Sequence, residues 1–221
     1  LCVTLPIHQA QAQVDRAGEH VRRLTERYSN AEAAHADLTA AYDAFAGSFA
    51  PSLVQGAGKG VADLAGANAR SRLRMTALYY FAGLNNLLVA GTGNKIEDFG
   101  VGFFTKYGDG GVDISPIADL TKTEVYELGR WLRVPEAILV APPTDGLFGD
   151  DRTDEQQIGA TYPELERAMA HAERGTDPAL LSGREREVYD IFLRRNRANR
   201  HKMEPIPVCR IPRYLVEPAG R

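Results

Sequence analysis

The chain of 221 residues is 44% hydrophobic and 25% charged, a composition that excludes wholesale disorder. Its length predicts a globular domain with a core large enough to fold without disulfide bonds or a structural metal. Its net charge of −3 gives no basic footprint for nucleic acid, although it allows a local cationic site for a small anion. Two distant cysteines, Cys2 and Cys209, fit a reducing environment. With no signal peptide or long apolar run in the sequence, we expect a cytoplasmic protein without a membrane partner.

Apolar residues predict a strand over residues 1–6. Because the chain opens inside this strand at a leucine, we expect an N-terminal part to be missing. Apolar spacings of three and four predict helices over residues 16–27 and 31–45. Residues 47–66 contain five glycines and one proline, which predicts a mobile loop. A strongly helical pattern follows over residues 69–83.

The second half of the chain alternates short apolar segments with helical patterns. Residues 87–90 predict a buried strand, residues 112–117 an extended segment, and Thr121 with Glu124 the capping box of a helix that ends near Leu132. Further helices are predicted over residues 135–140, 162–173 and 184–199, with an exposed acidic segment over 146–162 and an irregular tail from 203. Strands that alternate with helices predict an α/β fold, an open parallel sheet with helices on both faces and ligands at the carboxyl ends of its strands.

The turn after the predicted strand, GTGNKIE over residues 91–97, is a first candidate site. Its glycines let the backbone approach a phosphate or a ring closely. Thr92 offers a hydroxyl, and Glu97 offers a carboxylate of the kind that holds Mg²⁺. The alternative interpretation is an ordinary turn between a strand and a capped helix.

A second candidate is FFTKYGDGGVD over residues 103–113, which combines aromatic rings, a lysine and carboxylates among glycines. The rings can stack on a base or a pyridine, Lys106 can neutralise a phosphate, and Asp113 can accept from a hydroxyl or an amide. The alternative is a small hydrophobic cluster beneath a loop. The glycine density disfavours that alternative.

Basic residues mark three further places. Arg70 and Arg74 share one face of a predicted helix while Arg72 points elsewhere, a pattern that taken alone is more typical of a solvated basic face. His201 and Lys202 follow the cationic run 194–197, which also suits the C-terminus of a helix because cations offset the helix dipole there. Without a further signal, Lys122 would belong to the solvent face of its capped helix.

Five strings stand in order along the middle of the chain: RxRM (72–75), GTGNKxE (91–97), FFTKYGDGGVD (103–113), PIxDLTKTEV (116–125) and PPTDGL (142–147). Together they closely resemble the ammonia-dependent NAD synthetases, members of the ATP-pyrophosphatase group, and HK at 201–202 matches as well. The resemblance implies an adenine nucleotide α-hydrolase-like (Rossmann-like) fold. It also implies one synthetase domain over 1–221, with residues 29–66 as a family-variable helical or loop insertion.

The resemblance implies the last step of NAD biosynthesis. In that reaction ATP adenylates the carboxylate of deamido-NAD with release of pyrophosphate, and ammonia then displaces AMP to give NAD. The family uses Mg²⁺ and forms homodimers, so a homodimer is expected here.

Site residues carry over by motif. ATP would be bound by Thr92, Lys122, Thr144 and Gln9, with Gln11 as an alternative to Gln9. Deamido-NAD would be bound by Arg72, Lys106, Asp109, Asp113, His201 and Lys202. Glu97 would help bind Mg²⁺. Asp98 is the alternative ligand, because one residue more than in some relatives separates Glu97 from Phe103.

The sequence departs from the family in two places. The pyrophosphate-binding loop SGGxDS, which precedes the strand resembled by residues 1–6, is absent, and Thr4 stands where some relatives carry an arginine that contacts ATP. We therefore expect this chain alone to be unable to adenylate its substrate. An alternative is a non-catalytic homologue that binds nucleotide or dimerises. A ligase for another acid is disfavoured by FFTKYGDGGVD, which is tied to the dinucleotide in the family. Residues 1–221 contain no glutaminase domain, and the sequence leaves open whether the missing part contained one.

Overall fold

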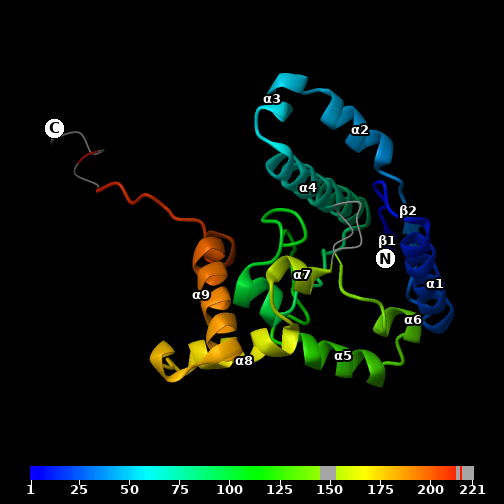
Figure 1. Ribbon diagram of the computed structural model, residues 1–221. Coiled ribbons are helices and arrows are strands. Elements are labelled where there is room, and N and C mark those ends of the chain that lie inside the picture. Colours follow the sequence, from blue (N-terminus) through cyan, green and yellow to red (C-terminus); the bar gives the residue numbers. More distant parts are fainter. Residues whose placement is uncertain (145–152, 213–214, 216–221) are drawn as a thin grey trace, which may run out of the picture.

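The computed structural model describes residues 1–144, 153–212 and 215 (Figure 1). The strands are β1 (Cys2–Thr4) and β2 (Ala33–His35), and the helices are α1 (Gln11–Arg27), α2 (Thr39–Gly47), α3 (Pro51–Gln55), α4 (Lys59–Asn85), α5 (Lys122–Trp131), α6 (Glu136–Leu139), α7 (Asp154–Ile158), α8 (Tyr162–Glu173) and α9 (Gly183–Met203). A π-helix, η1 (Lys95–Val101), and a 3₁₀ helix, η2 (Pro178–Leu180), complete them. No helix in the described part of the chain is long and apolar enough to cross a membrane.

The open parallel sheet with helices on both faces is only partly confirmed. Within the described residues, parallel pairing is limited to β1 with β2 and to an isolated bridge between Ala90 and Ile114. The two segments predicted as extended do meet there, since Gly91 N donates to Ile114 O at 2.7 Å. Leu88 is 68% exposed although the prediction buried it, because this segment has a single strand neighbour and one open face.

The N-terminal half contains two further corrections. Residues 31–45 are not one helix, because residues 33–35 form β2 and α2 starts only at Thr39, whose backbone N–H donates to Asp37 Oδ1 at 2.8 Å. The segment 47–66, predicted as a loop, contains α3 with Pro51 in its first turn and the beginning of α4. The long helix therefore starts at Lys59, ten residues earlier than the pattern over 69–83 indicated.

The main hydrophobic core lies where η1, α8 and α9 pack together in the lower left of Figure 1. Its most deeply buried members are Ile96, Val101 and Leu165, and Phe192 closes it from α9. The predicted helix over 162–173 is confirmed residue for residue, and α5 has the predicted capping box of Thr121 and Glu124. Asp154 is buried at the start of α7, so the acidic segment is not wholly exposed as predicted; Asp150 and Asp151 lie outside the described residues.

Candidate functional site

Two cavities lie on either side of α4. The first, of about 760 Å³, is bounded by α4, the turn at Gly91 and Thr92, the loop 102–111 and α9, and we call it the glycine-loop cavity. The second, of about 740 Å³, lies between β1 with the segment after it, α1, α5 and residues 138–144, and we call it the β1–α5 cavity. Both are large enough for a nucleotide-sized ligand.

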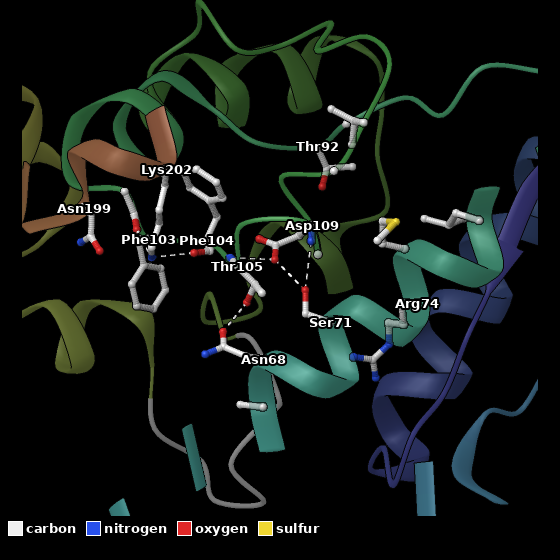
Figure 2. A pocket seen from close by; sticks show the side chains of 18 of the residues that line it. Asn68, Ser71, Arg74, Thr92, Phe103, Phe104, Thr105, Asp109, Asn199 and Lys202 are labelled. Carbon is white, nitrogen blue, oxygen red and sulfur yellow. Dashed lines mark hydrogen bonds between the residues drawn. The ribbon is translucent and has the colours of Figure 1, made fainter. Parts of the chain in front are cut away.

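Hydrogen bonds to α4 hold the glycine-rich loop in place (Figure 2). Asp109 Oδ1 accepts from Ser71 Oγ at 2.7 Å and from Thr105 N at 3.0 Å. Thr105 Oγ1 donates to Asn68 Oδ1 at 2.6 Å. A Cβ at Gly108 would lie 2.2 Å from Ser71 Oγ, so only glycine allows this close approach. Asp109 therefore lines the cavity and also clamps the loop.

Half-buried cations from α9 line the same cavity. Lys202 Nζ donates to the carbonyl oxygens of Gly102 at 2.9 Å and Phe104 at 2.7 Å. Arg195 donates from Nε to Ile158 O at 3.2 Å and from Nη2 to Gln157 O. Burial is the largest cause that lowers the pKa of both cations, and the charge of Asp109 acts in the opposite direction on Lys202. Among the described residues, neither cation has a carboxylate within ion-pair distance. Such cations favour an anionic ligand.

The other residues predicted to bind deamido-NAD divide into two groups. Arg72 Nε donates to Lys106 O at 3.2 Å and Lys106 Nζ donates to His201 O, so these three link α4, the loop and α9 at an exposed edge. Asp113 does not line either cavity. Its carboxylate accepts from Tyr79 OH at 3.0 Å and from Val89 N at 2.8 Å, which fixes the strand-like segment to α4.

The residues predicted to bind ATP are also divided between the cavities. Gln9, Lys122 and Thr144 line the β1–α5 cavity. Thr92 lines the glycine-loop cavity, on the other side of α4. The structure therefore gathers three of the four at one place.

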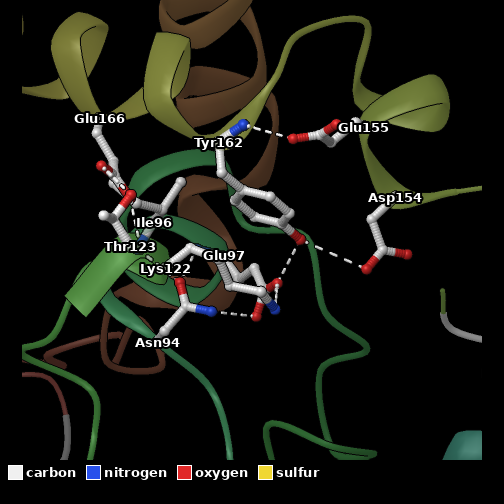
Figure 3. Close-up of polar contacts among 9 residues, drawn as sticks. All are labelled: Asn94, Ile96, Glu97, Lys122, Thr123, Asp154, Glu155, Tyr162 and Glu166. Atoms are coloured by element: carbon white, nitrogen blue, oxygen red, sulfur yellow. Dashed lines mark hydrogen bonds and ion pairs between the residues drawn. The ribbon is translucent and has the colours of Figure 1, made fainter. Parts of the chain in front are cut away.

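Glu97 is the centre of a polar cluster (Figure 3). Its Oε1 accepts from Lys122 Nζ at 2.9 Å and from Tyr162 OH at 2.5 Å, and its Oε2 accepts from Asn94 Nδ2 at 2.5 Å. Burial, followed by the charge of Glu97, raises the pKa of Tyr162 above its usual value, so the phenol remains a donor. The side chain of Glu97 is 15% exposed, and both of its oxygens already have partners.

Asp98, the alternative metal ligand, has different surroundings. A Cβ at Gly93 would lie 1.8 Å from Asp98 Oδ2, so the glycine makes room for this carboxylate. Burial and the charges of Asp109 and Glu97 raise the pKa of Asp98 to about 7. In residues 1–144 and 153–212, no group of three or more His, Cys, Asp or Glu side chains is arranged to hold a metal by itself.

Several residues of the site were not predicted from the sequence. Arg195 was assigned to a helix-dipole role, although Arg195, Asn199 and Lys202 follow spacings of four and three and so share one face of α9. That spacing was the available signal. Tyr162 gave none, because its contact with Glu97 depends on the packing of α8 against η1. Asn94 is the N-cap of η1 and contacts Glu97 three residues later, so an asparagine at a helix start was its available signal.

The NAD synthase family model matches residues 1–206. The NH(3)-dependent NAD(+) synthetase of Carboxydothermus hydrogenoformans is 45% identical over 139 residues, covering 63% of this chain and 52% of that protein. That of Archaeoglobus fulgidus is 43% identical over 155 residues, covering 70% and 59%. The chain thus spans about half the length of the curated relatives it matches.

Solved structures of synthetases are also similar to this chain. An NMN synthetase from Francisella tularensis matches with a TM-score of 0.76 and 30% identity, over 95% of this chain and 78% of that one. An NAD+ synthetase from Burkholderia pseudomallei matches with a TM-score of 0.61 and 31% identity, over 90% and 67%. Because the family model covers nearly the whole chain and these structures share its fold, the chain belongs to the NAD synthase family.

Proposed function

We propose that this chain takes part in the ATP-dependent amidation of a nicotinate nucleotide by ammonia. The first candidate substrate is deamido-NAD, which would give NAD, AMP and pyrophosphate. Membership of the family supports the reaction class. The curated relatives are NH(3)-dependent NAD(+) synthetases, which supports ammonia as the nitrogen donor. The chain spans only about half of those relatives, so the proposal concerns the nucleotide sites it carries.

One observation carries the proposal: the half-buried cations of the glycine-loop cavity. Lys202 and Arg195 point their charges toward backbone carbonyls rather than carboxylates. A partly desolvated cation without an ion-pair partner is costly, and a phosphate that contacts it directly offsets that cost. Phe103 and Phe104 line the same cavity and provide apolar surface for a flat ring.

The two cavities suit the two substrates of this chemistry. A carboxylate is a poor electrophile, so its oxygen first attacks the α-phosphorus of ATP. That step forms an acyl–phosphate bond and breaks the bond to pyrophosphate. Ammonia then attacks the carbonyl carbon, a C–N bond forms, AMP leaves with the C–O electron pair, and one proton passes to solvent. We assign ATP to the β1–α5 cavity, beside Lys122 and Thr144, and the nicotinate nucleotide to the glycine-loop cavity.

Mg²⁺ would be held here by carboxylates at the start of η1 together with phosphate oxygens. The donors fit, since Mg²⁺ prefers oxygen ligands and commonly takes one or two carboxylates. A metal at Glu97 would displace Lys122 from Oε1, whereas Asp98 has no hydrogen bond to lose among the described residues. When bound, the ion would neutralise charge on the phosphates of ATP.

A second candidate substrate is nicotinate mononucleotide. The NMN synthetase from Francisella tularensis matches this chain with a TM-score of 0.76, against 0.61 for the NAD+ synthetase from Burkholderia pseudomallei. Both substrates present the same carboxylate to the same cations. The difference lies in whether an adenylate half must also be bound.

A homodimer is also proposed. Large apolar side chains are exposed along α2, α3 and the start of α4, a surface that a monomer rarely leaves to solvent: Phe45, Phe49, Leu53, Val61 and Leu64. Light scattering coupled to size-exclusion chromatography tests it, and a monomer at micromolar concentration contradicts it.

Calorimetric titration tests the proposed function. Deamido-NAD and nicotinate mononucleotide are titrated separately into the wild type, Lys202→Gln and the control Arg23→Gln, whose side chain is exposed on α1. We expect one or both nucleotides to bind, about tenfold or more weakly to Lys202→Gln, since a charge-assisted bond is lost. Binding of neither nucleotide to the folded wild type contradicts the proposal.

A further inference from the structure

Arg74 lines both cavities, alone among the residues that the structure describes. Its side chain extends from α4 (Figure 2). Its Nε donates to Leu5 O at 2.8 Å and its Nη2 donates to Gln9 Oε1 at 3.0 Å. A guanidinium has five N–H bonds, so these two contacts fix its plane and leave three N–H bonds for a ligand.

Among residues 1–144 and 153–212, the charge of Arg74 has no carboxylate partner. Both of its acceptors are neutral, and no described carboxylate lies within ion-pair distance. Burial, and then the neighbouring charge of Arg70, lowers the pKa of Arg74. The ordinary pKa of a guanidinium is so high that the group stays ionised all the same. A half-buried cation of this kind is stabilised by an anion that enters from either cavity.

The proposed reaction brings two anions to this place. A carboxylate oxygen has to come within about 3–3.5 Å of a phosphorus atom that is itself surrounded by negative oxygens. Mutual repulsion opposes that approach. A fixed cation between the two groups offsets it, and a planar guanidinium can bind a carboxylate and a phosphate at the same time.

We propose, on the basis of the proposed function, that Arg74 contacts an anionic group of each substrate and so is a shared anion contact. Its guanidinium binds the carboxylate of the nicotinate nucleotide in the glycine-loop cavity and the α-phosphate of ATP in the β1–α5 cavity. The contacts with Leu5 and Gln9 hold it in this position before either ligand arrives. Because it touches both reacting groups, it would act as a catalytic residue.

Binding measured for each cavity in turn tests this inference. The probes are deamido-NAD and the ATP analogue with a methylene group between the α- and β-phosphates, titrated separately into the full chain with Mg²⁺. Arg74→Gln is expected to weaken both probes by about ten- to one-hundred-fold. Lys202→Gln should weaken only deamido-NAD and Lys122→Gln only the ATP analogue, because each lines a single cavity.

The outcomes separate this inference from the proposed function. If the folded wild type binds neither probe, the proposed function fails. If it binds both, and Arg74→Gln weakens one or neither, the shared contact is refuted while the proposed function stands. Thermal unfolding of each variant establishes that it is folded.

A second measurement needs no variant. The Nε–H resonance of Arg74 in ¹⁵N-labelled wild type can be assigned through the backbone signals of the same residue. We expect each probe, added alone, to shift that resonance. A resonance that responds to only one probe, while the other demonstrably binds, overturns the inference.

Discussion

Replacing Asp98 by asparagine should stabilise the protein at neutral pH. The carboxylate is partly buried beside Gly93, and burial with the charges of Asp109 and Glu97 raises its pKa from 3.8 to about 7. A raised pKa means that the folded state disfavours the ionised form. The penalty is therefore absent below about pH 4, grows as the pH rises, and is complete above about pH 7.

The magnitude follows from the shift. At about 1.4 kcal/mol per pKa unit, the full shift corresponds to about 4 kcal/mol as an upper limit. Solvent screening of a carboxylate that is not fully buried reduces this, and we expect Asp98→Asn to gain about 1–2 kcal/mol at pH 8. At pH 5 the gain should be about one third as large, because most of the titration range lies above that pH.

Urea unfolding at pH 5 and pH 8 measures the effect, in buffer with EDTA so that no divalent ion occupies the carboxylate. Asp119→Asn is the matched control, since Asp119 is exposed and close in sequence to α5. It should change the unfolding free energy little at either pH. An equal gain for Asp98→Asn at both pH values, or a loss at pH 8, would refute the reasoning.

Three further predictions concern stability and binding. Tyr162→Phe should cost about 1.5–3 kcal/mol in urea unfolding, because Glu97 loses a buried donor, while Tyr80→Phe on the exposed face of α4 should change little. Gly102→Ala should cost about 2 kcal/mol or more, because φ is +64° and the new Cβ would lie 2.4 Å from Asn199 Cβ; Gly83→Ala, in open space on α4, should instead gain about 0.5–1 kcal/mol. Arg195→Gln should weaken nucleotide binding about tenfold in calorimetry, and unchanged affinity would contradict its place in the site.

Local signals predicted the helices of the C-terminal half, α5 and α8 above all. The capping boxes of α5 and α8 consist of residues three apart, and Thr121 with Glu124 marked the start of α5 in the sequence. Such caps act within one turn, so no knowledge of the rest of the fold is required. Pairing between distant segments was not predictable in the same way. The residues of β2 have the composition of a helix. They are extended because they pair in parallel with β1, which lies some thirty residues earlier in the chain.

The same division between local signals and long-range packing applies to the candidate site. The motifs led to Asp109 and Lys202, which line the glycine-loop cavity, and to Lys122 and Thr144, which line the β1–α5 cavity. They did not indicate that Arg74 stands between the two cavities. That position depends on the segment between β1 and α1, whose Leu5 and Gln9 accept hydrogen bonds from Arg74, and helix spacing alone does not encode it.

The central claim is that the glycine-loop cavity binds a nicotinate nucleotide through half-buried cations. A crystal structure of the chain with deamido-NAD tests it most directly. We predict ligand phosphate oxygens within 4 Å of Lys202 Nζ or the Arg195 guanidinium, and the pyridine carboxylate directed toward Arg74. A nucleotide bound elsewhere, with these three cations still contacting only backbone and Gln9, would contradict the account.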